Sequence, residues 1–143
     1  MSRISNGSFV KLIYLCKYIN CFIHIIMTSK TVSISIPKLG QSIDFSVGKN
    51  ANGNFAILDN AKYNDIWFHI EGQSSCHVIA SVPDNIDRKD LRYIIKQGAV
   101  LCKQHSRHAS QKNIAVIYAR AEDVKKTDTM GTVLASNTKT VVI

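Results

Sequence analysis

The segment from Asp87 to Ala109 separates apolar from basic side chains at the spacing of an α-helix, and no other feature constrains the fold as strongly. Placed at 100° per residue, its mostly apolar positions gather on about one third of the circle. These positions are Leu91, Ile94, Ile95, Gly98, Leu101, Cys102, His105 and Ala109. Asp87 can cap the free amides of the first turn, and Asp90 suits the positive end of the helix dipole. The spacing predicts one long amphipathic helix over about 87–109, whose apolar face other elements must cover.

Basic side chains form a stripe beside this apolar face. They are Arg88, Lys89, Arg92, Lys96, Lys103 and Arg107. Residues 88–126 hold ten basic and three acidic side chains, which accounts for almost all of the net charge of +8 and the pI near 9.5. A solvated helix face normally mixes lysines with glutamates, whereas the only acid here is Asp90, near the cap. The stripe therefore predicts a surface that binds a polyanion through its phosphates.

Period-two alternation predicts that most of the remaining chain is β-structure. Strands are expected at 32–36, 43–47, 66–70, 76–82, 114–119 and 132–135, with a closing segment at 138–143. Residues 48–54 are rich in glycine and asparagine and predict a turn or loop, while 55–58 fits either a short helix or a strand. The expected fold class is α+β, a mostly antiparallel sheet packed against the long helix, in a single domain.

Residues 1–26 stand outside this pattern. They contain no acid, and Lys11 and Lys17 interrupt an apolar run that is already shorter than the roughly 20 residues of a membrane span. We expect an N-terminal extension over 1–26 and the folded domain over 27–143. Four cysteines without a CxxC pair favour free thiols and a cytoplasmic location, with organellar targeting or membrane anchoring by 1–26 left as alternatives.

The densest group of polar and aromatic side chains runs from Asp65 to His69 and is followed by His77. In a strand, Asp65, Trp67 and His69 share one face. If His77 lies on a neighbouring strand, the two imidazoles meet beside the indole. Two interpretations stand equally. The group is either a patch that stacks a base and hydrogen-bonds to RNA, or a buried histidine network that joins two strands.

Metal and nucleophile chemistry have weaker support. Donors for zinc are present at His69, Cys76, His77, Cys102, His105 and His108. However, Cys76 and His77 are adjacent, so a regular strand directs them to opposite faces, and no pair has the spacing of a zinc finger. The chain has no GxSxG, no phosphate-binding loop of the GxxxxGK[ST] type and no paired carboxylates. We expect no catalysis, no cofactor, no metal and no small-molecule substrate, with a zinc-dependent hydrolase as the unfavoured alternative.

Several short motifs occur in an order that characterises a known family. Asp65–His69 reads D-I-W-F-H and Ser75–Ile79 reads S-C-H-V-I. Further matching segments are Gly48–Asn50, Leu101–Ser106, Val116–Tyr118, Val124–Lys126, Gly131–Val133 and Asn137–Thr140. Together they resemble the NFACT RNA-binding domain family (NFACT-R) over nearly all of residues 32–142. The chain departs from the family at Cys76, where a small Ser or Ala is usual, and at Ser75, where Gly is usual.

The resemblance implies a compact α+β module that contacts RNA, notably tRNA on the large ribosomal subunit. Longer family members carry further domains and extend stalled nascent chains during ribosome-associated quality control. Those parts do not fit within this chain, which resembles a single-domain member, so tail synthesis is not expected.

We therefore expect non-catalytic binding of structured RNA, either tRNA or rRNA. The side chains expected to neutralise phosphates are Arg88, Arg92, Lys96, Lys103, Arg107, Lys125 and Lys126. Those of the family's signature patch are Asp65, Trp67, His69 and His77. DNA is a weaker candidate ligand, since phosphate contacts alone do not separate it from RNA. The alternative from another class is a protein-interaction module that docks on ribosomal or membrane partners.

Overall fold

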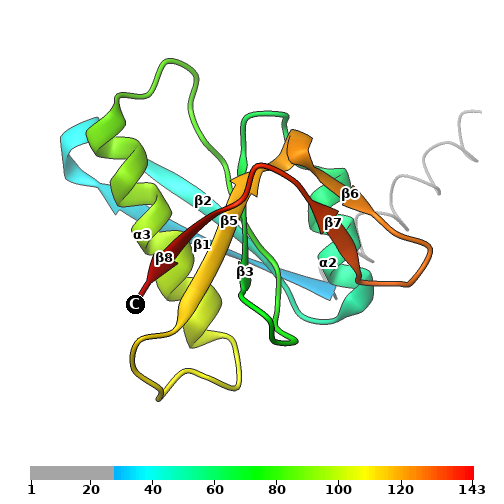
Figure 1. Ribbon diagram of the computed structural model, residues 1–143. Helices are drawn as coiled ribbons and strands as arrows, with labels where there is room; N and C mark the ends of the chain where they lie inside the picture. Colours follow the sequence, from blue (N-terminus) through cyan, green and yellow to red (C-terminus); the bar gives the residue numbers. More distant parts are fainter. Residues whose placement is uncertain (1–27) are drawn as a thin grey trace, which may run out of the picture.

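The computed structural model describes residues 28–143, and the expected extension over 1–26 lies outside the described residues (Figure 1). In chain order the elements are β1 (Ser29–Ile36), the short 3-10 helix η1 (Pro37–Leu39), β2 (Gln41–Gly48), α2 (Ala51–Asp59), β3 (Ile66–Ile70), β4 (Val78–Ala80), α3 (Arg88–Gln104), β5 (Ala115–Arg120), the short 3-10 helix η2 (Ala121–Asp123), β6 (Val124–Lys126), β7 (Val133–Ala135) and β8 (Lys139–Val142). Within this part of the chain, no helix has the length and apolar character needed to cross a bilayer.

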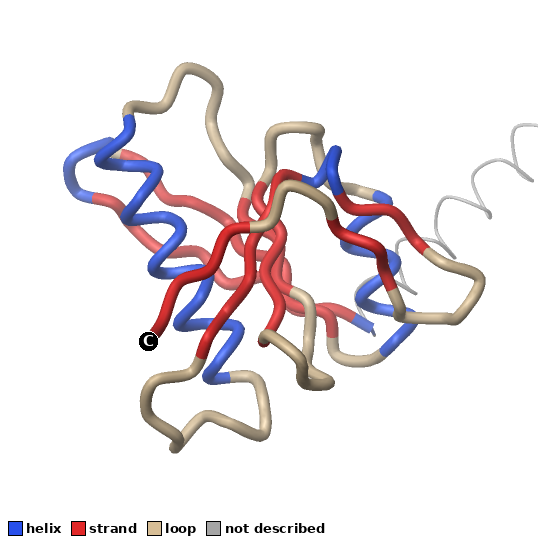
Figure 2. Tube along the Cα trace, viewed as in Figure 1, coloured by secondary structure: helices blue, strands red, loops and turns tan. Residues whose placement is uncertain are grey.

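A six-stranded sheet in the order β1-β2-β4-β3-β5-β8 forms the centre of the fold, and every neighbouring pair is antiparallel. Strands β6 and β7 form a separate antiparallel ribbon (Figure 2). The predicted α+β class with a mostly antiparallel sheet is confirmed. The expectation of a single helix is corrected, because α2 is present as well as α3.

Helix α3 covers one face of the sheet. Its cap is the predicted one, since the Asp87 carboxylate accepts hydrogen bonds from the amides of Lys89 and Asp90 at 2.7 and 2.9 Å. Gly98 faces the Phe68 ring so closely that a Cβ atom there would lie 2.3 Å from ring carbons. The largest buried side chains of this interface are Phe45, Phe68, Ile70, Val78, Ile94 and Val116. The absence of a side chain at Gly98 thus permits the close approach of the helix to the sheet at Phe68.

Helix α3 ends at Gln104, five residues before the predicted end. The amide of His105 donates to the carbonyl of Leu101, and the amide and hydroxyl of Ser106 both donate to the carbonyl of Lys103. These bonds close the last turn, so Arg107 leaves the helical face on which the periodicity had placed it.

Helix α2 replaces most of the loop predicted for residues 48–54. Asn50 caps it by accepting a hydrogen bond from the amide of Gly53 at 2.8 Å. A Cβ atom at Gly53 would lie 1.8 Å from the carbonyl oxygen of Thr28, so glycine permits close contact with the chain before β1. Glycine and asparagine favour loops in isolation, but here they serve as a cap and a contact point of a helix.

Helix α2 and the ribbon β6–β7 lie over the opposite face of the sheet from α3. The alternation of β3 directs Ile66, Phe68 and Ile70 toward the α3 side, whereas Trp67 joins the core beneath α2 and the ribbon. This second core contains Ile57, Trp67, Ile79, Ala119 and Val124. The sheet is therefore the middle of three layers, and the polar side of β3 faces α2.

Candidate functional site

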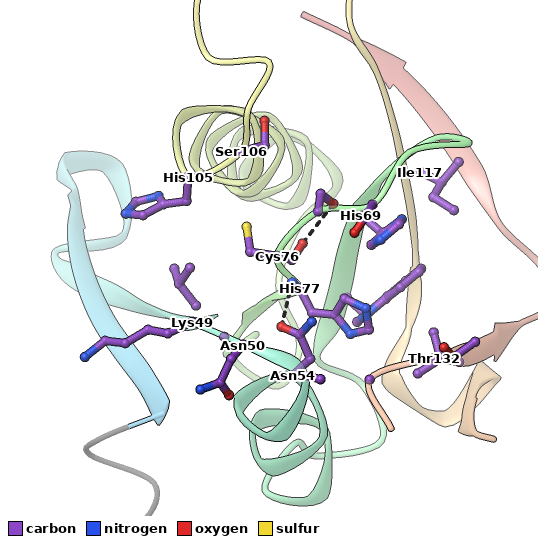
Figure 3. Close-up of a pocket in the computed structure, with 18 of the residues that line it drawn as sticks. Lys49, Asn50, Asn54, His69, Cys76, His77, His105, Ser106, Ile117 and Thr132 are labelled. Carbon is purple, nitrogen blue, oxygen red and sulfur yellow. Dashed lines mark hydrogen bonds between the residues drawn. The ribbon is translucent and has the colours of Figure 1, made fainter. Parts of the chain in front are cut away.

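A groove of about 1060 Å³ opens on the α2 side of the sheet (Figure 3). Its lining includes the turn from Gly48 with the start of α2, the histidines of the sheet, residues 105–107 after α3, and residues 130–133 and 135 in and before β7. Lys30 of β1 and Ile117 of β5 also line it. Its lining within the described residues includes the cations Lys30, Lys49 and Arg107 and no carboxylate. We refer to this cavity as the groove.

Three aromatic rings form the floor of the groove. The Trp67 and His69 rings are stacked, with centroids 5.7 Å apart and planes 3° apart. The His77 ring meets both of them edge-on, at 5.3 Å from Trp67 and 5.1 Å from His69. The antiparallel register of Phe68 with Val78 places His77 opposite His69. The two imidazoles therefore meet beside the indole, in the geometry that the sequence predicted for neighbouring strands.

Burial keeps both imidazoles of the floor uncharged near neutral pH. It lowers the pKa of His77 to about 3, and the neighbouring His69 adds a smaller effect in the same direction. Burial also lowers the pKa of His69, partly opposed by a hydrogen bond with the backbone of Ile70. The floor therefore offers neutral hydrogen-bonding groups, and the positive charge lies at the rim.

Two nitrogen atoms of the floor are buried without a hydrogen-bond partner among the described residues. They are Trp67 Nε1 and His77 Nδ1, and both side chains are only 2% exposed. Buried polar atoms normally have partners, so this pair needs water or a ligand group to complete it. The low exposure of Trp67 also means that its face is covered, and His69, which is half-buried, is the ring that remains accessible in the stack.

Asp65 lies at the other end of β3 and does not line the groove. Its carboxylate accepts hydrogen bonds from the amides of Lys62 and Val82 at 2.8 and 3.0 Å, and the residue is 3% exposed. It therefore joins the turn before β3 to the segment after β4. Of the four residues of the predicted signature patch, the structure brings together Trp67, His69 and His77, and separates Asp65 from them.

The predicted phosphate-binding residues do not form one surface. Arg88, Arg92 and Lys96 are exposed along α3, and none of them forms an ion pair with a carboxylate of the described residues. The ammonium of Lys103 donates to the carbonyl of Ile143 at 3.4 Å. We call Arg88, Arg92 and Lys96 the α3 row. Arg107 lines the groove, on another side of the molecule from the α3 row.

The two lysines of β6 differ in their surroundings. Lys125 is exposed, whereas the Lys126 ammonium lies 2.6 Å from the Asp59 carboxylate and 5.3 Å from the centre of the Phe55 ring. Lys126 is thus held against α2.

The sequence interpretation missed Lys30 and Lys49 as site residues. The Gly48–Asn50 motif was the available signal for Lys49, while Lys30 lies in an alternating strand that gave no such signal.

Cys76 lines the groove and is hydrogen-bonded to the buried Cys102. Each donates a weak hydrogen bond to the other's carbonyl oxygen, at 3.7 and 3.6 Å. The contact with Cys76, together with burial, raises the pKa of Cys102, while the pKa of Cys76 is lowered by their hydrogen bond. Over residues 28–143, no group of three or more His, Cys, Asp or Glu side chains is placed to hold a metal ion.

Comparison with known proteins identifies the family of this chain. The sequence profile described as the NFACT protein RNA binding domain matches residues 44–140, so the chain belongs to this family of RNA-binding domains. No curated protein sequence matches the chain. Among solved structures, the chain is similar to the C-terminal part of the fibronectin/fibrinogen-binding protein from Streptococcus suis, with a TM-score of 0.66 and 23% identity. That similarity covers 81% of this chain and 44% of the other, and it establishes a shared fold.

Proposed function

We propose that this chain binds structured RNA, tRNA or rRNA, through phosphate contacts and without catalysis, in a role linked to translation or ribosome-associated quality control. Membership of a family of RNA-binding domains supports RNA as the ligand. The proposal for tRNA or rRNA and for a link to the ribosome comes from the family resemblance.

The α3 row is the observation that carries this proposal. Arg88, Arg92 and Lys96 follow one another at intervals of four residues, which spaces them by about 6 Å along the helix axis. All three are exposed, and no carboxylate of the described residues neutralises them. Cations that are not already paired can release the counterions of a phosphate backbone on binding, which is the main source of sequence-independent affinity for nucleic acids.

The remaining basic residues differ in how free they are to contact a phosphate. Lys126 must give up its ion pair with Asp59 before it can contact a phosphate, so we expect a smaller contribution from it than from the exposed Lys125. Lys103 is already engaged with the backbone of Ile143, and we expect it to contribute less than Arg92 or Lys96.

Titration of the protein with tRNA at several salt concentrations tests the proposal. Three phosphate contacts predict that log K falls against log salt with a slope of about −2 to −3. The double variant R92E/K96E should bind at least about tenfold more weakly and with a shallower slope. Lys62→Glu is the matched control, because this exposed lysine lies outside both the α3 row and the groove. A slope near zero for the unmodified protein would reject phosphate binding.

Two further measurements distinguish RNA binding from DNA binding and from a protein-interaction module. Duplex DNA should compete poorly with tRNA at fixed salt if RNA is the ligand. If R92E/K96E binds RNA as well as the unmodified protein does but loses a ribosomal protein partner, the chain is a protein-interaction module. Crosslinking in cells, followed by sequencing of the bound RNA, then identifies the RNA species.

A further inference from the structure

We propose that the groove holds one unpaired nucleotide of the bound RNA, with its base on His69 and its phosphate at the cationic rim. This inference rests on the proposed function and adds a site on the opposite side of the sheet from the α3 row. No feature of the α3 row distinguishes paired from unpaired RNA, since it offers only charges to the backbone.

The distribution of charge in the groove matches a nucleotide. The rim supplies Lys30, Lys49 and Arg107, while the floor supplies rings that carry no charge near neutral pH. A nucleotide has the same two parts, an anionic phosphate and a neutral, flat base. Because no carboxylate of residues 28–143 lines the groove, none of the described lining side chains repels the phosphate.

The stack on the floor has one open end. The Trp67 and His69 rings are parallel within 3°, Trp67 is buried, and His69 is half-buried. A base placed on the accessible face of His69 would extend this stack by one ring. Recognition of single-stranded RNA commonly uses such stacking of unpaired bases on aromatic side chains, histidine included.

The unpartnered nitrogens supply a second, independent observation. Trp67 Nε1 can only donate, and the neutral His77 ring donates at one nitrogen and accepts at the other. Both residues line the groove, and both unpartnered atoms are buried. A base stacked on the outer face of His69 lies away from Trp67, whereas the His77 ring meets His69 edge-on at 5.1 Å, so His77 is the neutral group nearest to the donors and acceptors of that base's edge.

The phosphate end is formed by the start of α2. Asn50 and Ala51 line the groove there, and the first amides of a helix favour an anion. Contacts of the Asn54 side chain hold the backbone around Gly48 and His77 in place. Asn54 Oδ1 accepts a hydrogen bond from the His77 amide at 3.0 Å, and a Cβ atom at Gly48 would lie 2.1 Å from the same oxygen (Figure 3). The side chain of Lys49 extends outward from this turn, in keeping with a place at the rim (Figure 3).

The volume of the groove accommodates a nucleotide. Its 1060 Å³ lies just above the range of small-molecule pockets, which is about 300–1,000 Å³. A base with its sugar and phosphate fits such a cavity, whereas a base-paired segment would have to open before one of its bases could enter. The groove therefore selects RNA with a bulged, looped or terminal nucleotide.

Two RNA hairpins that differ by a single bulged nucleotide test this inference. In one hairpin the bulged base is the fluorescent analogue 2-aminopurine, and the other hairpin is fully paired. We expect the unmodified protein to bind the bulged hairpin about tenfold more tightly and to quench the fluorescence through stacking. Lys49→Ala and His69→Leu should bring this preference to within about twofold while leaving binding of the paired hairpin almost unchanged.

The controls separate this inference from the proposed function. Arg92→Ala should weaken binding of both hairpins by the same factor, and Lys62→Ala should change neither. If the protein binds neither hairpin, the proposed function fails, and this inference with it. If it binds both equally, and Lys49→Ala has no effect, RNA binding stands and the nucleotide site is wrong. Lys49 is exposed, so its variant keeps the test valid even if His69→Leu does not fold.

A free nucleoside monophosphate distinguishes a site for RNA from a site for a small molecule. Since the groove contacts only one nucleotide, the free compound should compete with the bulged hairpin only at millimolar concentration. Competition at micromolar concentration would assign the groove to a free nucleotide and overturn the inference.

Discussion

His77 connects three elements through its backbone and its ring. Its amide donates to Asn54 of α2, its carbonyl accepts from Gly48 at the end of β2, and its ring contacts Trp67 and His69 of β3. These contacts join three elements, as the histidine-network alternative of the sequence interpretation requires, and the ligand patch stays a proposal. His77 also lines the groove, and its Nδ1 atom is buried without a hydrogen-bond partner among the described residues.

The stability of the protein should fall as the pH decreases below about 6.5. Burial lowers the pKa of His77 to about 3 in the folded protein, so the unfolded chain binds more protons between these values. The free energy of unfolding should therefore decrease by up to about 1.4 kcal/mol per pH unit in this range, and His69 acts in the same direction. In the part of the chain that the structure describes, no carboxylate lines the groove to offset this change.

Chemical denaturation at pH 5.0 and 7.5 measures this dependence. His77→Gln should lower stability at both pH values and should also reduce the difference between them. An unchanged difference in that variant would show that His77 is not the group that titrates.

At the scale of elements, the contact between α3 and β3 depends on the absence of a side chain at Gly98. Alanine normally stabilises a helix interior relative to glycine by about 1 kcal/mol. Here the added Cβ atom would lie 2.3 Å from the Phe68 ring, which is fully buried. Helix propensity and packing therefore predict opposite signs for the same substitution.

We expect Gly98→Ala to destabilise the domain by about 1–3 kcal/mol, since overpacking of a filled core outweighs the gain in propensity. Thermal or urea unfolding measures the change. The double variant G98A/F68L should recover part of the lost stability, because leucine leaves space where the ring stood. A Gly98→Ala variant that is more stable than the original protein would contradict this account of the interface.

At the scale of the whole molecule, the described cations that we assign to RNA binding in the α3 row and the groove lie on two sides of the sheet. The α3 row lies on the α3 side, and Lys30, Lys49 and Arg107 surround the groove on the α2 side. An RNA that contacts both must pass around an edge of the domain. Because these two sets share no ion-pair partner among the described residues, each should contribute independently to binding.

Additivity of variants tests this independence. Lys49→Ala and Arg92→Ala should weaken binding of the bulged hairpin by amounts that add within about 0.5 kcal/mol in the double variant. Binding titrations of both single variants and the double variant at one salt concentration provide the comparison. A double variant that is no weaker than the worse single variant would mean that the two surfaces do not bind the same RNA together.

The sequence by itself determined the features that depend on local periodicity. Alternation located the edges of β1, β2, β3 and β5 within a few residues, and the apolar spacing with Asp87 located the start of α3. The antiparallel α+β class followed from these elements, and the ordered motifs identified the family. Such patterns can be recognised in a sequence because each residue's burial is set by its position on its own strand or helix.

Only the tertiary structure decided which side chains meet. The order β1-β2-β4-β3-β5-β8 brought Lys30 and Lys49 to the groove with Arg107, and the end of α3 at Gln104 separated Arg107 from the α3 row. Lys126 forms an ion pair with Asp59, and Gly53 lies in α2 so close to Thr28 that no side chain would fit there. Each of these outcomes depends on a contact between residues far apart in the chain, and local periodicity carries no information about such contacts.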